Sequence, residues 1–187
     1  MANPLTKVVT GKCRFSYCNL VRPEKADDGT EKYKVTLLIP KSDTKTIHKM
    51  HAAIQAAADE YRDKNGAKSL PAHPVTTLYD GDGRRRNGEA FGEECKGCMV
   101  ITVSSKKKPV IFDSDKQEML GVTEDDLYSG CYGRAAIRFC GYNSGTNKGI
   151  SAFIISIQKL ADGEPLSGSP ASADDYDDDD DDYTDLL

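Results

Sequence analysis

The segment GCYGRAAIRFCGYN, residues 130–143, most strongly restricts the fold that this chain can adopt. Its apolar side chains Ala135, Ile137 and Phe139 alternate with polar or aromatic ones, which is the two-residue period of a β-strand buried on one face. Other runs with strand character lie at residues 12–20, 32–40, 99–103 and 150–160. The chain is therefore expected to be mainly β.

One helix is expected between the early and the late strands. Ser42 or Asp43 can cap its first turn, and apolar residues from Ile47 to Tyr61 recur at steps of three and four along one face. Asn65-Gly66 ends this pattern, and the following residues to about 97 are expected to be mostly loop. About five strands with an inserted helix indicate a β-barrel, and the OB-fold, a five-stranded partly open barrel, fits best.

The C-terminal part of the chain holds a large share of its acidic charge. The whole chain has a formal net charge of −5, but without the nine aspartates of residues 174–187 it has 25 basic and 21 acidic side chains, hence +4. From Asp162 the composition shifts to Gly, Ser, Pro and Ala, so we expect an OB-fold domain at residues 1–161 and a flexible linker with a disordered acidic tail at 162–187. The tail centres on a run of six acidic residues: Asp177, Asp178, Asp179, Asp180, Asp181 and Asp182. This charge asymmetry indicates a polyanionic partner.

Sequence signals for export, catalysis and metal binding are weak. The N-terminal residues show no signal-peptide core and no run approaches the roughly 18 apolar residues of a membrane span, so we expect a cytoplasmic location and six reduced cysteines. Cys95 and Cys98 form a CxxC, but a zinc site needs four ligands and no second CxxC exists, which favours ordinary thiols. No phosphate-binding loop, nucleophile elbow or carboxylate constellation is present, and we expect neither an enzyme nor a cofactor.

The strand at residues 132–142 also has the most informative functional pattern. Four residues lie opposite its apolar face: Tyr132, Arg134, Arg138 and Tyr142. Aromatic rings can stack on unpaired bases, and arginine adds charge and a second planar surface. Tyrosine and arginine are also common partners on any solvated sheet face, so this pattern alone leaves both interpretations open.

Two basic clusters are suited to phosphate groups. Arg84, Arg85 and Arg86 lie at the tip of a glycine-flanked loop, and Lys106–Lys108 form a basic turn. A cationic loop can follow a nucleic-acid backbone without reading its sequence. For either cluster alone, a solvated loop without a ligand is the simpler interpretation.

Several segments resemble a family of bacteriophage single-stranded DNA-binding proteins. They are KYKVTLLIPKSD, SSKKKPVIFD, YSGCYGRAAIRFCGYNSGTNKGIS and IQKLADGEPLSG, and the likeness extends from about Lys12 to the tail. The resemblance implies an OB-fold with an acidic C-terminal tail, sequence-independent coating of single strands in phage DNA replication, recombination and repair, and recruitment of replication proteins by the tail. Position by position, it points to Tyr132, Arg134, Tyr142 and Lys148, and less strongly to Tyr17 and Lys34.

The sequence therefore predicts a sequence-independent single-stranded DNA-binding protein whose tail competes with DNA for the same groove. Phosphate contacts are expected from Lys34, Arg84, Arg85 and Lys148, and base stacking from Tyr17, Tyr132 and Tyr142. A homo-oligomer is an open possibility. The alternative is a phage interaction protein that binds a host factor and uses its acidic tail as a DNA mimic, a function that needs no stacking face.

Overall fold

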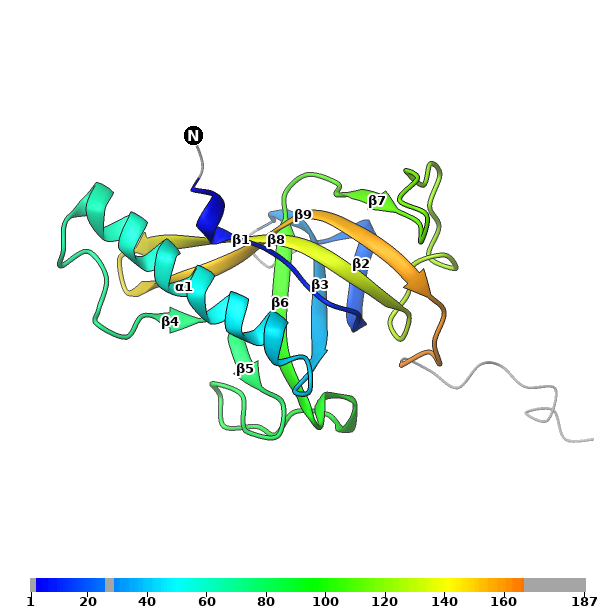
Figure 1. The fold of residues 1–187 in the computed structure, drawn as a ribbon, viewed down its shortest axis with the longest axis horizontal. Helices are drawn as coiled ribbons and strands as arrows, with labels where there is room; N and C mark the ends of the chain where they lie inside the picture. Colours follow the sequence, from blue (N-terminus) through cyan, green and yellow to red (C-terminus); the bar gives the residue numbers. More distant parts are fainter. Residues whose placement is uncertain (1–2, 26–28, 167–187) are drawn as a thin grey trace, which may run out of the picture.

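Strands dominate the computed structural model, which describes residues 3–25 and 29–166 (Figure 1). The five long strands are β2 (Cys13–Lys25), β3 (Glu31–Pro40), β6 (Cys98–Ser105), β8 (Tyr132–Ser144) and β9 (Asn147–Ala161). The four short strands are β1 (Lys7–Val9), β4 (Val75–Thr76), β5 (Leu78–Asp80) and β7 (Val110–Phe112). One long helix, α1 (Thr44–Asn65), and two 3-10 turns, η1 (Pro4–Thr6) and η2 (Glu93–Cys95), complete the described elements.

The five long strands close into a barrel. They pair in the order β8-β2-β3-β6-β9, and β9 then pairs with β8 along almost its whole length, which returns the sheet to its start. The seam between β6 and β9 is paired at a single position, Ser104 with Phe153, so the barrel is only partly closed there. The expected mainly β chain with a five-stranded, partly open barrel is confirmed.

Alternation along β8 determines which of its side chains enter the barrel. Ala135, Ile137 and Phe139 are buried, as expected, and they join a core that includes Phe15 of β2 and Leu37 of β3. The residues between them in β8 face outward. Burial of large apolar side chains contributes roughly 1.5–3 kcal/mol each, so this inward face provides much of the driving force for barrel closure.

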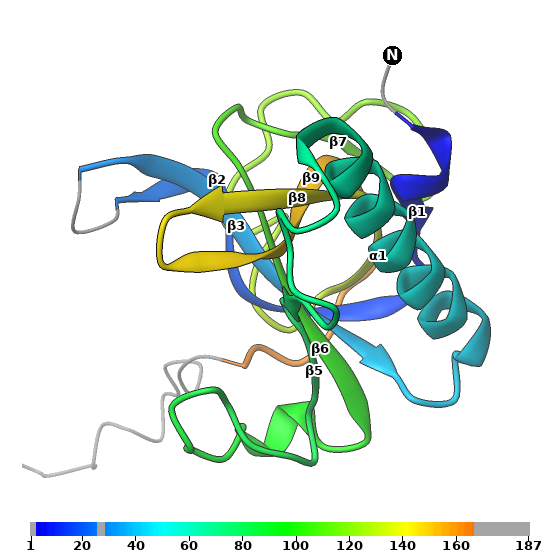
Figure 2. The same cartoon turned by 90° about the vertical axis from the view of Figure 1, so that its left-hand side faces the viewer.

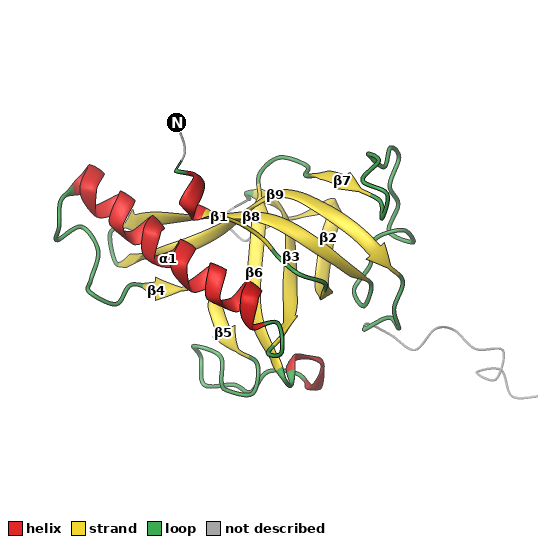
Figure 3. Cartoon of the chain, viewed as in Figure 1, coloured by secondary structure: helices red, strands yellow, loops and turns green. Residues whose placement is uncertain are grey.

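Helix α1 covers part of the barrel beside β8 (Figure 3). Asp43 caps its N-terminus by accepting a hydrogen bond from the Thr46 backbone N–H at 3.1 Å, and Gly66 ends it with a φ of 96°. Met50 and Ala53 are fully buried against the core. The predicted cap, apolar face and end of the helix are all confirmed.

The region expected to be mostly loop contains two short strands. β4 pairs with β9 and β5 pairs with β6, partners that are distant in sequence. With only two or three residues, these strands show no alternation of apolar and polar side chains. They form because they pair with strands of the barrel. Figure 2 shows α1 on one side of the barrel and the β2–β3 hairpin projecting from the other. No helix in residues 3–25 and 29–166 has both the length and the apolar character that a membrane crossing needs.

Candidate nucleic-acid interface

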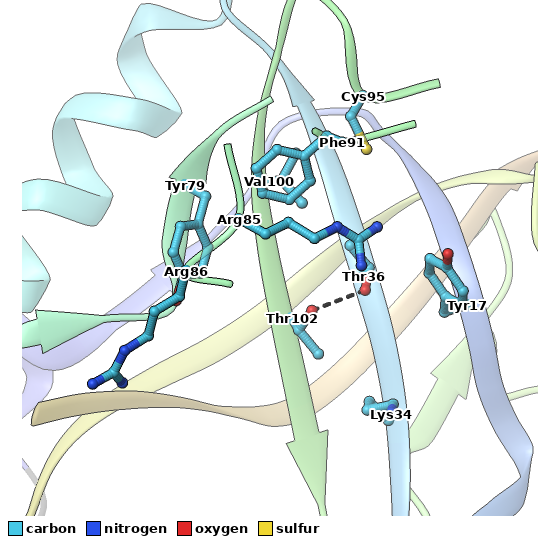
Figure 4. Close-up of a pocket in the computed structure, with 10 residues that line it drawn as sticks. All are labelled: Tyr17, Lys34, Thr36, Tyr79, Arg85, Arg86, Phe91, Cys95, Val100 and Thr102. Atoms are coloured by element: carbon cyan, nitrogen blue, oxygen red, sulfur yellow. Dashed lines mark hydrogen bonds between the residues drawn. The ribbon is translucent and has the colours of Figure 1, made fainter. Parts of the chain in front are cut away.

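The outer faces of β2, β3 and β6 form the floor of a groove of about 340 Å³ (Figure 4). The loop between β5 and β6, residues 81–97, forms one wall and the outer edge of β2 forms the other. Most of the side chains that line the groove are aromatic, cationic or hydroxyl-bearing, and Cys95 and Val100 complete the lining. The first group consists of Tyr17, Lys34, Thr36, Tyr79, Arg85, Arg86, Phe91 and Thr102.

Strand β5 and the loop at residues 81–97 together place an aromatic pair and an arginine on this wall. The ring centroids of Tyr79 and Phe91 are 6.1 Å apart at an interplanar angle of 49°, and the guanidinium carbon of Arg85 lies 5.3 Å from the centroid of the Phe91 ring. In Figure 4 the Arg85 side chain extends from the loop toward Thr36 on the floor. Its Nε is buried and has no hydrogen-bond partner among the described residues, so it retains a free donor.

Tyr17 is the aromatic residue of the opposite wall. It lies where the register of β2 against β3 shifts between Ser16 and Asn19, and its φ is 46°, in the left-handed region. Tyr17 is 57% exposed, which is unusual for a large residue in the middle of a strand. The bulge therefore presents one face of a tyrosine to the groove.

The floor of the groove is polar and cationic. The hydroxyl groups of Thr36 on β3 and Thr102 on β6 share a hydrogen bond of 2.9 Å. Lys34, the next outward residue on β3, forms an ion pair with Glu24 of β2. Exposed ion pairs contribute little to stability, so a phosphate can replace this carboxylate at small cost.

A second hollow, also of about 340 Å³, continues the groove toward β9. Lys34 and Thr102 line both hollows, and Ser104 of β6 and Ser151 of β9 line the second one. The two hollows together form a track across the sheet, from the loop at residues 81–97 to β9.

An ionic cluster anchors the base of the loop wall. The Lys41 ammonium lies 2.6 Å from both the Asp80 and the Asp82 carboxylates, and Asp82 also accepts a hydrogen bond of 3.0 Å from the Gly97 backbone N–H. The Lys41 hydrogen bonds lower the pKa of both carboxyl groups, and the bond to Asp80 raises the pKa of Lys41. The two ends of the loop are thus tied to the end of β3.

Three of the residues predicted from the sequence meet in the groove. Tyr17, Lys34 and Arg85 come from β2, β3 and the loop wall, and all three line it. Arg84 does not line it, because its guanidinium donates to the Gly88 carbonyl within the same loop at 2.9 Å. Arg86, the third arginine of that cluster, does line the groove.

Two predicted residues near the start of β8 face outward at some distance from the groove. Tyr132 lies between Lys12 and Arg14, whose charged groups are 4.9 and 5.7 Å from its ring centroid. Arg134 donates to the Thr10 carbonyl at 2.9 Å. Neither residue lines the groove or the hollow that continues it.

The remaining predicted residues lie along the β8–β9 hairpin. Arg138 pairs in register with Phe153, and Tyr142 pairs with Gly149, where an added Cβ would lie 3.1 Å from the tyrosine hydroxyl. Lys148 is exposed near the hairpin turn. The outward direction predicted for these side chains agrees with the burial pattern, but β8 and the groove strands form different parts of the barrel wall.

Sequence reasoning did not identify the aromatic pair Tyr79 and Phe91 or the threonine pair of the floor. Phe91 is the one aromatic residue in the polar segment GDGRRRNGEAFGEE, and that isolation was an available signal. Thr36 and Thr102 gave no signal, because only the register of β3 with β6 brings them together.

The cysteines of the described chain are unpaired thiols. Burial raises the pKa of Cys13 and Cys18 to about 12 and that of Cys95 to about 11. Within residues 3–25 and 29–166, no group of three or more potential metal ligands lies together.

The predicted tail residues Asp177–Asp182 lie outside the described residues. The segment before them, residues 162–166, packs on the barrel: Arg14 donates to the Glu164 carbonyl at 2.6 Å, and the Leu166 N–H donates to the Ser129 carbonyl at 2.9 Å. The Leu166 side chain packs against a small buried cluster of Leu38, Cys95 and Val100, of which Cys95 and Val100 line the groove. The described chain therefore ends beside the groove.

Comparisons with known proteins agree with this architecture. The sequence model of the family described as "Enterobacter phage Enc34, ssDNA-binding protein" matches residues 6–187. Protein p50 of Acyrthosiphon pisum secondary endosymbiont phage 1 is 30% identical over 179 residues, which are 92% of this chain and 93% of that protein.

Solved structures show the same fold. The single-stranded DNA-binding protein from bacteriophage Enc34 in complex with ssDNA superposes with a TM-score of 0.71 at 25% identity, covering 88% of this chain and 91% of that one. The single-stranded DNA-binding protein gp2.5 of bacteriophage T7 shares the fold, with a TM-score of 0.62 at 13% identity, covering 92% and 99%. The predicted resemblance is confirmed: this chain belongs to the family of the Enterobacter phage Enc34 ssDNA-binding protein.

Proposed function

We propose that this protein binds single-stranded DNA, without sequence preference, in the groove between β2, β3, β6 and the loop at residues 81–97. The observation that carries the proposal is the arrangement of Tyr17 and the Tyr79–Phe91 pair on opposite walls, with Lys34, Arg85 and Arg86 between or beside them. The Enc34 relative, whose structure contains ssDNA, supports it.

The groove suits bare nucleotides because it offers rings and cations but few groups that could read a base. Every base has a flat face, and stacking on an aromatic side chain is worth roughly 1–3 kcal/mol per base with little dependence on base identity. The bases of a duplex are stacked on each other and cannot reach Tyr17 or Phe91. The groove therefore favours single strands over duplex DNA.

The cationic side chains hold the backbone. The Arg85 guanidinium lies beside the Phe91 ring and lines the groove, and Lys34 can exchange Glu24 for a phosphate. Each phosphate neutralised on a single strand contributes about −0.7 to the slope of log affinity against log salt. Lys148, Arg84, Tyr132 and Arg134 lie outside the groove, and we propose them only as secondary contacts.

We further propose that the acidic tail competes with DNA for this groove and recruits replication proteins when DNA displaces it. Leu166 lies beside the groove, and nine aspartates follow between residues 174 and 187. A tethered polyanion acts as an intramolecular ligand at high effective concentration. In the host cytoplasm such a protein would coat single strands during phage replication, recombination and repair.

Titration with oligothymidine, duplex DNA and RNA tests the proposal. We expect oligothymidine to bind more tightly than duplex, with an affinity that falls as salt rises. Replacing Tyr17 by Ala should weaken binding to single strands by about 5- to 150-fold, the equivalent of one lost stacking contact.

Tyr17→Phe is the matched control, because it keeps the ring and should keep most of the affinity. Equal affinity for duplex and single strands, or full affinity in a protein that carries both Tyr17→Ala and Phe91→Ala, would contradict the proposal.

A further inference from the structure

Strand register places five outward residues in one row across the barrel. Lys7 of β1 pairs with Arg138 of β8, Arg138 pairs with Phe153 of β9, Phe153 pairs with Ser104 of β6, and Ser104 pairs with Lys34 of β3. Residues paired in register project from the same face of a sheet. The row therefore connects the floor of the groove to the β8–β1 side of the barrel.

Phe153 is an aromatic residue that the core does not use. It is 44% exposed, although the β9 residues on either side of it, Ala152 and Ile154, are buried. Its register partner Ser104 lines the hollow that continues the groove. The ring thus lies at the point where the track of the proposed function reaches β9.

Arg138 is the cation next to this ring. Its Nε is buried without a hydrogen-bond partner, and no carboxylate of the described residues forms an ion pair with it. The charge of Arg138 is therefore not balanced by an acidic side chain of the described residues. Lys7, on its other side, also has no ion pair among the described residues.

The cationic surface continues beyond Lys7. A further hollow of about 360 Å³ is lined by Lys7, Lys116 and Arg134, with Phe112 at its side. Basic and aromatic side chains recur there as they do in the groove. Charge complementarity and continuity with the groove both indicate the same ligand, a single-stranded nucleic acid.

We infer that single-stranded DNA leaves the groove over Ser104 and continues across Phe153 toward Arg138 and Lys7. One base stacks on Phe153, and the adjoining phosphate accepts hydrogen bonds from the Arg138 guanidinium. This inference rests on the proposed function and extends it, because it makes the binding surface longer than the groove. At a strand spacing of about 4.8 Å, the three steps from β6 over β9 and β8 to β1 add about 14 Å to the groove.

Tryptophan substitution tests the two halves of the track separately, because the natural chain has no tryptophan. Tyr17→Trp reports on the groove and Phe153→Trp on the extension. Each is titrated with oligothymidines of about 4 to about 16 nucleotides, the range of footprints on one OB-fold. We expect all oligomers that bind to quench Tyr17→Trp, and only the longer ones to quench Phe153→Trp.

Ile155→Trp is the matched control. Ile155 lies on the same strand with a similar exposure of 38%, but the shift of register between Ala136 and Ile137 leaves it without a partner on β8. Its emission should not change. Quenching of Tyr17→Trp by a saturating 16-mer with unchanged Phe153→Trp emission would overturn the extension and leave the groove intact.

The salt dependence of DNA binding tests the role of Arg138 separately. Arg138→Ala should lower the salt slope for long oligomers by about 0.7 and leave short oligomers unaffected, since one phosphate contact is lost. Arg138→Lys keeps the charge and should restore the slope. An unchanged salt slope in Arg138→Ala would overturn the proposed phosphate contact of Arg138. If neither wild-type protein nor Tyr17→Trp bound any oligomer, the proposed function itself would be refuted.

Discussion

Tyr17 has a φ of 46°, in a region that costs a residue with a side chain roughly 1–2 kcal/mol. Its ring is mostly exposed and contributes little to the core. Backbone strain of this kind persists where the surrounding structure imposes it, and it is common at binding sites. The strain at Tyr17 is explained if the bulge serves to present the ring to a ligand.

Tyr17→Gly should therefore separate stability from binding. Glycine adopts a positive φ without strain, so the free energy of unfolding should stay equal or rise by up to about 1 kcal/mol once the larger chain entropy of glycine is included. Affinity for oligothymidine should fall at least about 5-fold, because the ring is lost. Urea denaturation and DNA titration of the same preparation measure both quantities.

Tyr17→Ala is the control for this substitution, since it removes the ring and keeps the strain. It should lose affinity without gaining stability. If Tyr17→Gly lowered stability more than Tyr17→Ala did, the bulge would not be strained in the way proposed.

Single residues also show what the sequence could and could not predict about the site. The outward direction of Tyr132, Arg134, Arg138 and Tyr142 followed from the period of one strand, because alternation is a local property. Their distance from the groove did not follow, because neighbourhood on a barrel depends on pairing between strands far apart in sequence. For the same reason Tyr79 and Phe91 were missed, although Tyr17, Lys34 and Arg85 were named.

The loop at residues 81–97 is the element that most directly shapes the groove. It carries Arg85, Arg86 and Phe91, and the Lys41 cluster ties its two ends to β3. Preorganisation of such a loop lowers the entropy lost on binding. If DNA binds in the groove as proposed, Lys41 is expected to act on that binding through the loop, as a positioning residue.

Lys41→Met should weaken binding to single strands and speed hydrogen exchange at the Gly97 amide, whose acceptor is Asp82. Lys45→Met removes the same charge from an exposed position on α1 and serves as the control.

The Lys41 cluster should also make the loop sensitive to pH. Because the pKa of Asp80 and of Asp82 is lowered from 3.8, the cluster stabilises the loop above pH 3.8, and this stabilisation is lost as the pH falls through the lowered pKa values. The protection of the Gly97 amide against hydrogen exchange should likewise be lost as the pH falls through these values. Equal protection in Lys41→Met and in wild type would exclude the anchoring role of Lys41.

Elements with a strong local pattern could be predicted from the sequence. The helix cap at Asp43, the helix end before Gly66 and the alternation of β8 each depend on residues within a few positions of one another. β4 and β5 could not be predicted, since two or three residues carry no period and depend on β9 and β6 for pairing. The bulge at Tyr17 was likewise invisible, because nothing in its neighbours requires a positive φ.

On the scale of the whole molecule, the division of charge is the dominant feature. A body of net charge +4 is joined to a segment with nine aspartates, and the described chain ends beside the groove at Leu166. Opposite charges within one chain attract most strongly at low ionic strength, where the screening length is long. The tail and DNA are therefore expected to exclude each other from the groove.

Deleting residues 174–187 should tighten binding to oligothymidine at low salt, and the gain should shrink as salt rises. A full-length variant in which these nine aspartates are replaced by Asn keeps the length and should behave like the truncation. Equal affinity of full-length and truncated protein at low salt would rule out competition by the tail.

The central claim is that bare nucleotides contact the groove between Tyr17 and Phe91. Ultraviolet cross-linking of the full-length protein to oligothymidine, followed by mass spectrometry of the cross-linked peptides, tests it most directly. The account predicts cross-links at Tyr17 and at Tyr79 or Phe91. Efficient cross-linking that involves none of these three residues would contradict it.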